Sequence, residues 1–214
     1  MTERAVVEEL LDTAGRTYAE EAGIALANKP APLFQLLMMT ELLSKPISAS
    51  LAVGAAKELV GGGYRTPRRV ADAERQELVD ALGRGHYRRY DESTATNLGE
   101  LATAVLERYD GDLRELGEEA EHDTARAARL LREFKGIGPT GSDIFLREVQ
   151  DIWPWSSPYF DDRARRGAAR VGLPDDPARL GALAPHRRAA LAAALVRVGL
   201  DEDLAERIHA AAPE

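Results

Sequence analysis

The stretch FKGIGPTGSD, residues 134–143, decides the fold, because its glycines have two incompatible interpretations. Gly136, Gly138 and Gly141 have the spacing G-x-G-x-x-G, which in a sheet-based nucleotide fold holds a dinucleotide pyrophosphate. That fold needs a buried strand before the first glycine. The residues that precede it, ARAARLLREFK, instead predict a charged helix with one apolar side. No Lys-Ser/Thr pair follows the glycines, so a Walker phosphate loop is excluded as well.

The remaining phosphate-binding interpretation is a helix–hairpin–helix, in which a glycine turn joins two helices. We expect left-handed backbone at Gly136 and Gly138, and a second helix from Pro139 to about Gln150, because proline suits the first helical turn. Amide N–H groups at the start of that helix bind a phosphate oxygen without requiring positive side chains. The alternative is a simple helical turn with glycine caps and no ligand.

The rest of the chain predicts an all-α class. Apolar residues recur at helical spacing, as in Leu98, Leu101, Ala102, Val105 and Leu106, and no alternating stretch is typical of a strand. Glycine and proline separate the helices, of which we expect roughly ten. Residues 29–32 are predicted to end the first helix, residues 61–63 to close another, and Asp110-Gly111 to end a long one.

Composition excludes several classes of protein. The 214 residues suit one large domain or two small lobes, and the absence of cysteine excludes disulfides, zinc–thiolate sites, iron–sulfur clusters and cysteine nucleophiles. A net charge of −8 argues against a surface coated in positive charge for nucleic acid, but leaves a local basic patch open. No run of about 18 apolar residues is present, so we expect no membrane span. The acidic start, MTERAVVEELLD, does not resemble a secretory signal, and we expect a cytoplasmic protein.

A second cluster of charged residues lies in PYFDDRARRGAARVG, residues 158–172. Asp161 and Asp162 open a predicted helix, where carboxylates are favourable as caps. Beside a DNA clamp, a carboxylate has a second use, since it can stabilise an oxocarbenium-like sugar and activate water for attack at C1′. The arginines that follow give local positive charge or a solvated, salt-bridged helix face; they are Arg163, Arg165, Arg166 and Arg170.

FKGIGPTGSDIFL followed by PYFDDRARRGAARVG resembles the helix–hairpin–helix-Gly-Pro-Asp (HhH-GPD) superfamily of DNA glycosylases, which includes the endonuclease III type and the alkyl-base glycosylases. The likeness extends over residues 30–210 with lower specificity. It implies an all-α, two-lobed fold with a central DNA cleft. It also implies a base-excision-repair enzyme that hydrolyses the N-glycosidic bond of a damaged base, alkylated bases included, flipped out of duplex DNA.

The resemblance assigns roles to individual residues. Asp161 matches the catalytic aspartate in phase, with Asp162 as the alternative. Bifunctional members carry a lysine where this chain has Thr140, and a hydroxyl cannot form an imine, so we expect no lysine-dependent lyase activity. Gln35 stands where adenine glycosylases have a catalytic glutamate, and Glu41 aligns poorly with that position. The expected DNA-binding residues are those of the hairpin: Lys135, Gly136, Ile137, Gly138, Thr140 and Gly141.

A flipped base needs a pocket, and aromatic residues lie between the hairpin and the aspartate. Trp153, Trp155 and Tyr159 are the candidate walls, and the alternative for the tryptophans is a role as core anchors. We expect no cofactor and no metal held by side chains; the resemblance implies only that hairpin carbonyls can hold a monovalent cation. The expected partner is double-stranded DNA with a damaged base, bound by a monomer.

The resemblance divides the chain into four segments. Residues 1–30 form an N-terminal helix on the discontinuous lobe, and residues 31–135 a helical lobe with the wedge loop. Residues 136–150 form the hairpin turn and its second helix, and residues 151–214 the aspartate helix and the closing helices. Two alternatives stay open: a non-catalytic helix–hairpin–helix DNA-binding or damage-sensing protein, and an α-helical interaction protein that keeps the scaffold.

Overall fold

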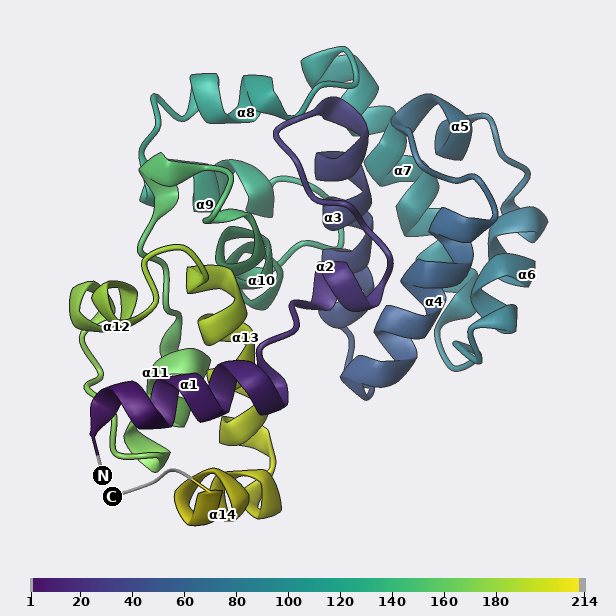
Figure 1. Ribbon diagram of the computed structural model, residues 1–214. Coiled ribbons are helices and arrows are strands. Elements are labelled where there is room, and N and C mark those ends of the chain that lie inside the picture. The colour runs from purple at the N-terminus through teal and green to yellow at the C-terminus, as the bar shows by residue number, and fades with distance from the viewer. Residues whose placement is uncertain (1, 212–214) are drawn as a thin grey trace. The chain divides into compact units, whose positions relative to one another are not determined.

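The computed structural model describes residues 2–211, and every regular element in that range is helical (Figure 1). It contains fourteen α-helices and one 3-10 helix, which confirms the all-α class for the described part of the chain. The helices outnumber the expected ten because short ones such as α5 (Pro67–Ala71) and α8 (Arg114–Glu119) carry too few residues to show a periodicity. None of the described helices has the length and apolar character needed to cross a membrane.

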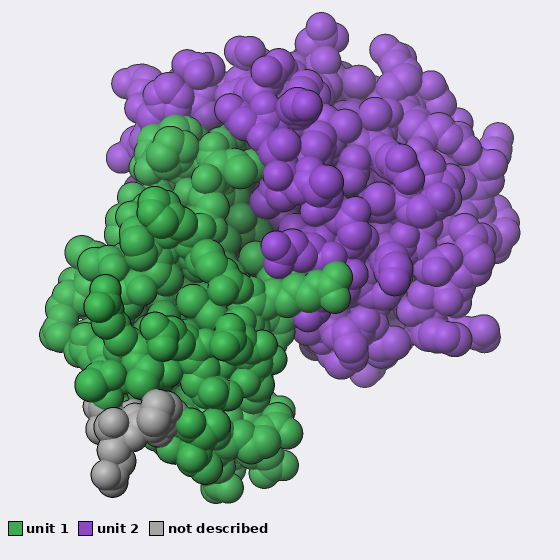
Figure 2. Space-filling model, in the orientation of Figure 1, with its two compact units in different colours: residues 1–18, 146–214 green, residues 19–145 purple. Residues whose placement is uncertain are grey.

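The chain divides into two compact units, coloured separately in Figure 2. Unit 1 comprises residues 1–18 and 146–214, and unit 2 comprises residues 19–145. Helix α10, Pro139–Val149, carries the chain from unit 2 into unit 1. The hairpin glycines therefore belong to unit 2, whereas Asp161 belongs to unit 1.

Unit 2 is built on helix α3, Pro30–Leu43, whose residues from Leu33 to Leu42 are all buried. A helix that is apolar all round has to be covered on every side. Helices α4 (Ala49–Gly61) and α7 (Asp91–Tyr109) pack against α3, and α6 (Arg75–Arg84) packs against both α4 and α7. The left-handed Asp110 ends α7, and Gly62 caps α4, as predicted.

The sequence predicted that the prolines near residue 30 end a helix. In the structure they begin one. Helix α1 already ends at Ala14, and α3 starts at Pro30. Proline is favoured at the first helical position because the amide hydrogen that it lacks has no helical acceptor there. The short helix α2, Tyr18–Glu21, lies between them.

Unit 1 is built on helix α13, Arg188–Leu200, which is also buried on all sides. Helix α11, Asp162–Arg170, crosses it so closely that a Cβ on Gly167 would lie 1.8 Å from the carbonyl oxygen of Leu195. Three further helices complete the core: α1 (Glu3–Ala14), α12 (Pro177–Leu183) and α14 (Glu202–Ala211). The segment between α10 and α11 contains the 3-10 helix Pro154–Ser156.

Candidate functional site

The glycine turn begins where helix α9, Thr124–Arg132, ends. The amide of Ile137 donates to the carbonyl of Phe134 at 3.1 Å, and Gly136 between them has φ +89°. L-residues rarely adopt that conformation, which explains the glycine. Gly138 is not left-handed, so the expectation of two left-handed glycines is wrong. A single left-handed residue, Gly136, redirects the chain into α10. The backbone conformation at Gly138 does not require a glycine.

Two of the glycines are also required by packing within unit 2. A Cβ on Gly136 would lie 3.0 Å from both Cγ and Oε1 of Glu41. A Cβ on Gly141 would lie 2.8 Å from the Oγ of Ser44 and 3.1 Å from Cγ2 of Ile137. Since Glu41 and Ser44 belong to α3 and the residue after it, the turn rests directly on the central helix of its unit.

The first turn of α10 contains backbone amides without a helical acceptor; Gly138 and Thr140 are partly exposed, whereas Gly141 is buried. The first helical hydrogen bond runs from the amide of Ser142 to the carbonyl of Gly138, at 3.0 Å, and Pro139 has no amide hydrogen. Within residues 2–211, the amides of Gly138, Thr140 and Gly141 have no protein acceptor. Unpaired N–H groups at the start of an eleven-residue helix favour an anion there.

Two cationic side chains flank this turn. Lys135 is 63% exposed, and its Nζ lies 2.6 Å from Oε2 of Glu100 on α7. Arg132, the last residue of α9, donates from Nε to the Oγ of Ser142 at 2.9 Å, and that hydroxyl donates onward to the carbonyl of Pro139. Arg132 is exposed, and its guanidinium is held beside the first turn of α10 by the bond from Nε to Ser142.

Beneath the turn lies a fully buried carboxylate, Glu41. Its Oε1 accepts from the Nζ of Lys45 at 2.9 Å and from the Nδ2 of Asn97 at 3.1 Å. Its Oε2 is buried without a protein donor in the described part of the chain. Burial raises the pKa of the Glu41 carboxyl above its ordinary 4.5, against the opposing effects of Lys45 and Asn97.

In unit 1, Asp161 is the N-cap of α11. Its Oδ1 accepts from the amide of Ala164 at 2.9 Å, and its Oδ2 accepts from Nη1 of Arg147 at 2.6 Å. The two side chains of this ion pair are 5% and 2% exposed. Asp162 differs in every respect: its side chain is 83% exposed and lies 3.5 Å from Arg165. The buried, doubly bonded carboxylate is therefore Asp161.

The segment that leads to Asp161 is held by Gln150, at the end of α10. The side-chain amide of Gln150 donates to the carbonyl of Tyr159 at 3.0 Å, and its oxygen accepts from the amide of Tyr159 at 2.8 Å. Trp153 is buried and stacks on the half-buried Trp155, with ring centroids 4.9 Å apart. Trp153 thus belongs to the core, whereas Trp155 and Tyr159 keep part of their rings exposed.

Sequence reasoning assigned no role to Arg132 and Arg147, and it named Glu41 only as a poor match for a catalytic glutamate; the structure places all three at these points. A signal existed for two of them. Glu41 interrupts the apolar run LLMMTELL, and Arg147 follows IFL on the buried side of α10. A charged residue at an apolar position indicates a buried ion pair or a site. Arg132 carries no such signal, because it lies among other arginines of an amphipathic helix.

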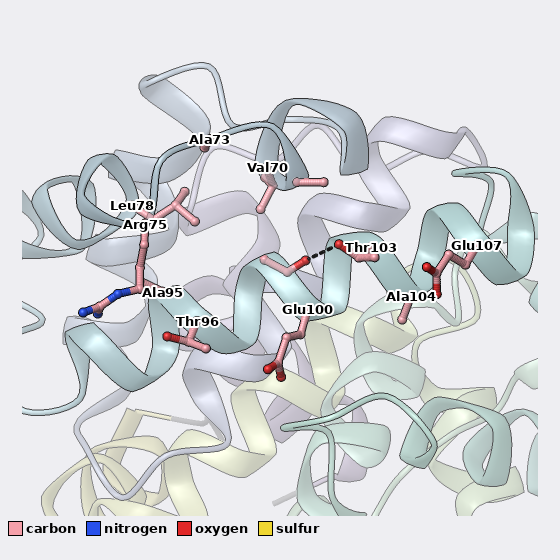
Figure 3. Close-up of a pocket in the computed structure, with 12 residues that line it drawn as sticks. Val70, Ala73, Arg75, Leu78, Ala95, Thr96, Glu100, Thr103, Ala104 and Glu107 are labelled. Atoms are coloured by element: carbon pink, nitrogen blue, oxygen red, sulfur yellow. Dashed lines mark hydrogen bonds between the residues drawn. The ribbon is translucent and has the colours of Figure 1, made fainter.

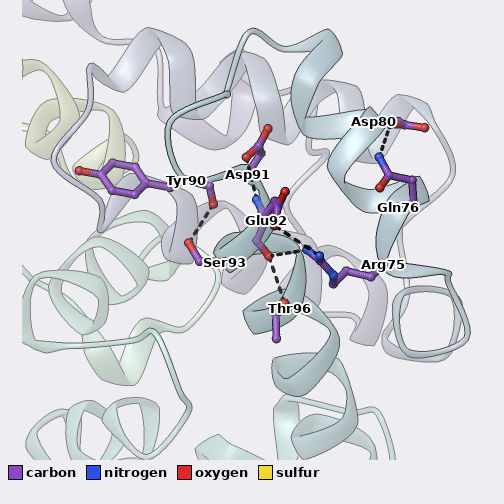
Figure 4. A network of polar contacts seen from close by, with 8 residues as sticks. All are labelled: Arg75, Gln76, Asp80, Tyr90, Asp91, Glu92, Ser93 and Thr96. Atoms are coloured by element: carbon purple, nitrogen blue, oxygen red, sulfur yellow. Dashed lines mark hydrogen bonds and ion pairs between the residues drawn. The ribbon is translucent and has the colours of Figure 1, made fainter.

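Unit 2 also has a surface groove of about 450 Å³, shown in Figure 3, and its lining includes Glu100, the partner of Lys135. Small residues of α7 form its floor, including Ala95, Thr96, Gly99 and Thr103, and Val70 and Leu78 lie on its other side. At one end of it, Arg75 joins α6 to α7 by contacts with Glu92 at 3.4 Å (Figure 4). Among the described residues, no three His, Cys, Asp or Glu side chains converge to hold a metal ion.

No family model matches this chain, and no curated protein matches it significantly. Among solved structures it is similar to a trapped endonuclease III–DNA covalent intermediate, described as an estranged-adenine complex. That match has 16% sequence identity and a TM-score of 0.47, and covers 92% of this chain and 85% of the other. At this level the likeness transfers no function, which has to be argued from this chain's own residues.

Proposed function

We propose that this protein is a DNA glycosylase that hydrolyses the N-glycosidic bond of a damaged base. The observation that carries the proposal is the turn at Gly136, with its free amides at the start of α10. The DNA phosphate is the anion that such a turn binds, since DNA presents phosphates at every nucleotide. Incubation with duplexes that carry a panel of damaged bases, followed by alkali, tests the proposal.

Binding through amides agrees with the charge of the chain. The chain carries a net charge of −8, and several arginines are already paired with carboxylates, as in Arg108 with Glu119 and Glu133. Amide N–H groups bind a phosphate without carrying a net charge. Arg132 adds one guanidinium beside the first turn of α10. We therefore expect a modest dependence of DNA affinity on salt, because few phosphates meet full charges.

In the proposed reaction the damaged nucleotide leaves the base stack, and its C1′–N bond breaks to give a cationic sugar and a free base. Asp161 is the candidate carboxylate for stabilising that cation and orienting water. The departing base keeps the electron pair of the broken bond, the water oxygen bonds to C1′, and the proton that the water loses passes to Asp161 and on to the base, which leaves an abasic site. The buried Arg147 compensates the charge of Asp161 in unit 1. Thr140 supplies no amine, so no imine and no lysine-dependent strand cleavage follow.

Arg132 gives the first testable prediction. Arg132→Gln is expected to weaken binding to an undamaged duplex, because one guanidinium–phosphate contact is lost. The slope of log Kobs against log[salt] is expected to shrink by about 0.9, the value for one phosphate. Fluorescence anisotropy at several salt concentrations measures both quantities.

Arg129→Gln is the matched control, since Arg129 is exposed on the same helix and the substitution removes the same charge. It is expected to leave the slope unchanged. If both variants lose the same affinity and the same amount of salt slope, Arg132 contributes only through the net charge of the protein and not through a phosphate contact.

A second candidate is a non-catalytic DNA-binding or damage-sensing protein. The burial of Asp161 favours it, because a carboxylate that is 5% exposed and bonded through both oxygens offers little access to a sugar. Both functions use the hairpin to bind DNA, and they differ only in whether the glycosidic bond is hydrolysed. Binding of lesion duplexes without formation of abasic sites would select the second. A central DNA cleft, a bound monovalent cation, the monomeric state and a cytoplasmic location stay predictions.

A further inference from the structure

We infer that Glu41 is a positioning residue for the hairpin: its buried side chain supports Gly136 from below and fixes the turn to α3 and α7. This role deepens the proposed function and rests on it. Gly136 is the residue that redirects the chain, and a Cβ built on it would lie 3.0 Å from Cγ and Oε1 of Glu41.

Glu41 is itself fixed by two helices. Lys45, four residues later and just beyond the end of α3, lies 2.9 Å from Oε1, and Asn97 on α7 donates to the same oxygen at 3.1 Å. The side chain therefore transmits the relative position of α3 and α7 to the turn. A displacement of about 1 Å is enough to weaken the bonds that amide groups make to an anion. A rigid support below Gly136 therefore preserves phosphate binding.

Burying a carboxylate below Gly136 costs free energy. An apolar side chain would fill the same space below Gly136 without the penalty of burying a charge. Glu41 instead leaves Oε2 without a protein donor in the described chain, and a buried orphan oxygen of this kind requires an explanation. A carboxylate has one property that an apolar side chain lacks, because it can gain or lose a proton. The conformation of the turn is therefore expected to change when Glu41 is protonated.

The direction of that response follows from the surroundings. The titratable groups that face Glu41 are Lys45, two residues after the end of α3, and Tyr87 in the loop before α7; Asn97 and Gly136 are neutral. Burial raises the pKa of Glu41, so the folded protein holds this proton at a pH where the unfolded chain has lost it. A phosphate bound at the turn adds negative charge, which favours the protonated form further. DNA affinity is thus expected to fall as pH rises through the pKa of Glu41.

Amide chemical shifts of residues 136–138 test the inference without DNA. In the wild-type protein they are expected to titrate together, with a midpoint above the ordinary 4.5 of a glutamate, and Glu41→Gln is expected to abolish that titration. Glu58→Gln, on the exposed pair with Arg84, is the control and is expected to leave it unchanged. The inference is overturned if the titration is missing from the wild type or persists in Glu41→Gln.

Binding to an undamaged duplex forms the second arm. Glu41→Ala is expected to lose affinity by about tenfold, whereas Glu41→Gln, which keeps the shape and lacks the negative charge, is expected to bind at least as tightly as the wild type. If Glu41→Ala does not fold, Asn97→Ala removes one of the two bonds to Oε1 and is expected to lose about threefold. A folded Glu41→Ala or Asn97→Ala protein with wild-type affinity would refute the positioning role. A wild type that binds no duplex refutes the proposed function instead, and leaves the amide titration to decide on Glu41.

Discussion

Arg147→Met is expected to destabilise the protein by about 3–5 kcal/mol, the range for breaking a buried ion pair from one side. Arg147 and Asp161 are 2% and 5% exposed, so the carboxylate would be left buried and uncompensated. Methionine has a similar length and fills most of the space, which limits the cavity contribution. The free energy of unfolding, measured with urea at neutral pH, gives the result.

Two companion variants separate charge from packing. Arg166→Met changes an exposed arginine of α11 and is expected to alter stability by less than about 0.5 kcal/mol. The double variant Arg147→Met/Asp161→Leu removes both charges and is expected to recover much of the lost stability. If the single Arg147 variant is as stable as the wild type, the ion pair does not hold Asp161 in place.

Asp161→Asn is expected to lower the single-turnover rate of base excision by about 10²- to 10⁴-fold, because the charge that stabilises the cationic sugar is removed. Asparagine is as good an N-cap as aspartate, so α11 keeps its start. The rate is measured at a temperature at which circular dichroism shows the variant folded, since Arg147 loses its partner in this variant.

Asp162→Asn is the matched control, because the neighbouring carboxylate is 83% exposed and bonds only weakly to Arg165. Its excision rate is expected to stay within about twofold of the wild type. The reverse outcome, with Asp162→Asn inactive and Asp161→Asn active, would move the catalytic assignment to Asp162.

Local features of the fold were predictable from the sequence. Helix α10 runs from Pro139 to Val149, against an expected end near Gln150, and the left-handed Asp110 ends α7. These features depend on propensities within a few residues, such as proline at the first helical position and glycine or a left-handed residue after the last. The start of α3 at Pro30 was missed, since a proline after a lysine is compatible with either the end or the start of a helix.

The pairing of charged residues was not predictable, because it depends on tertiary contacts. Nothing in the local sequence links Glu41 to Gly136, or Arg147 to Asp161. The sequence suggested that Asp161 opens a helix, and the structure agrees, but its ion pair with the buried guanidinium of Arg147 was not expected. Periodicity indicates which face of a helix is buried, and not which polar groups meet there.

Hydrolytic excision is tested most directly by incubation of the wild-type protein with duplexes that carry a panel of damaged bases. Each sample is divided and analysed on a denaturing gel with and without hot alkali. The proposed function predicts at least one lesion for which strand breaks appear only after alkali, which reveals an abasic site. Breaks without alkali would contradict the assignment of Thr140 as a residue without lyase chemistry. No breaks in either half, for any lesion that the protein binds, would contradict the glycosylase itself.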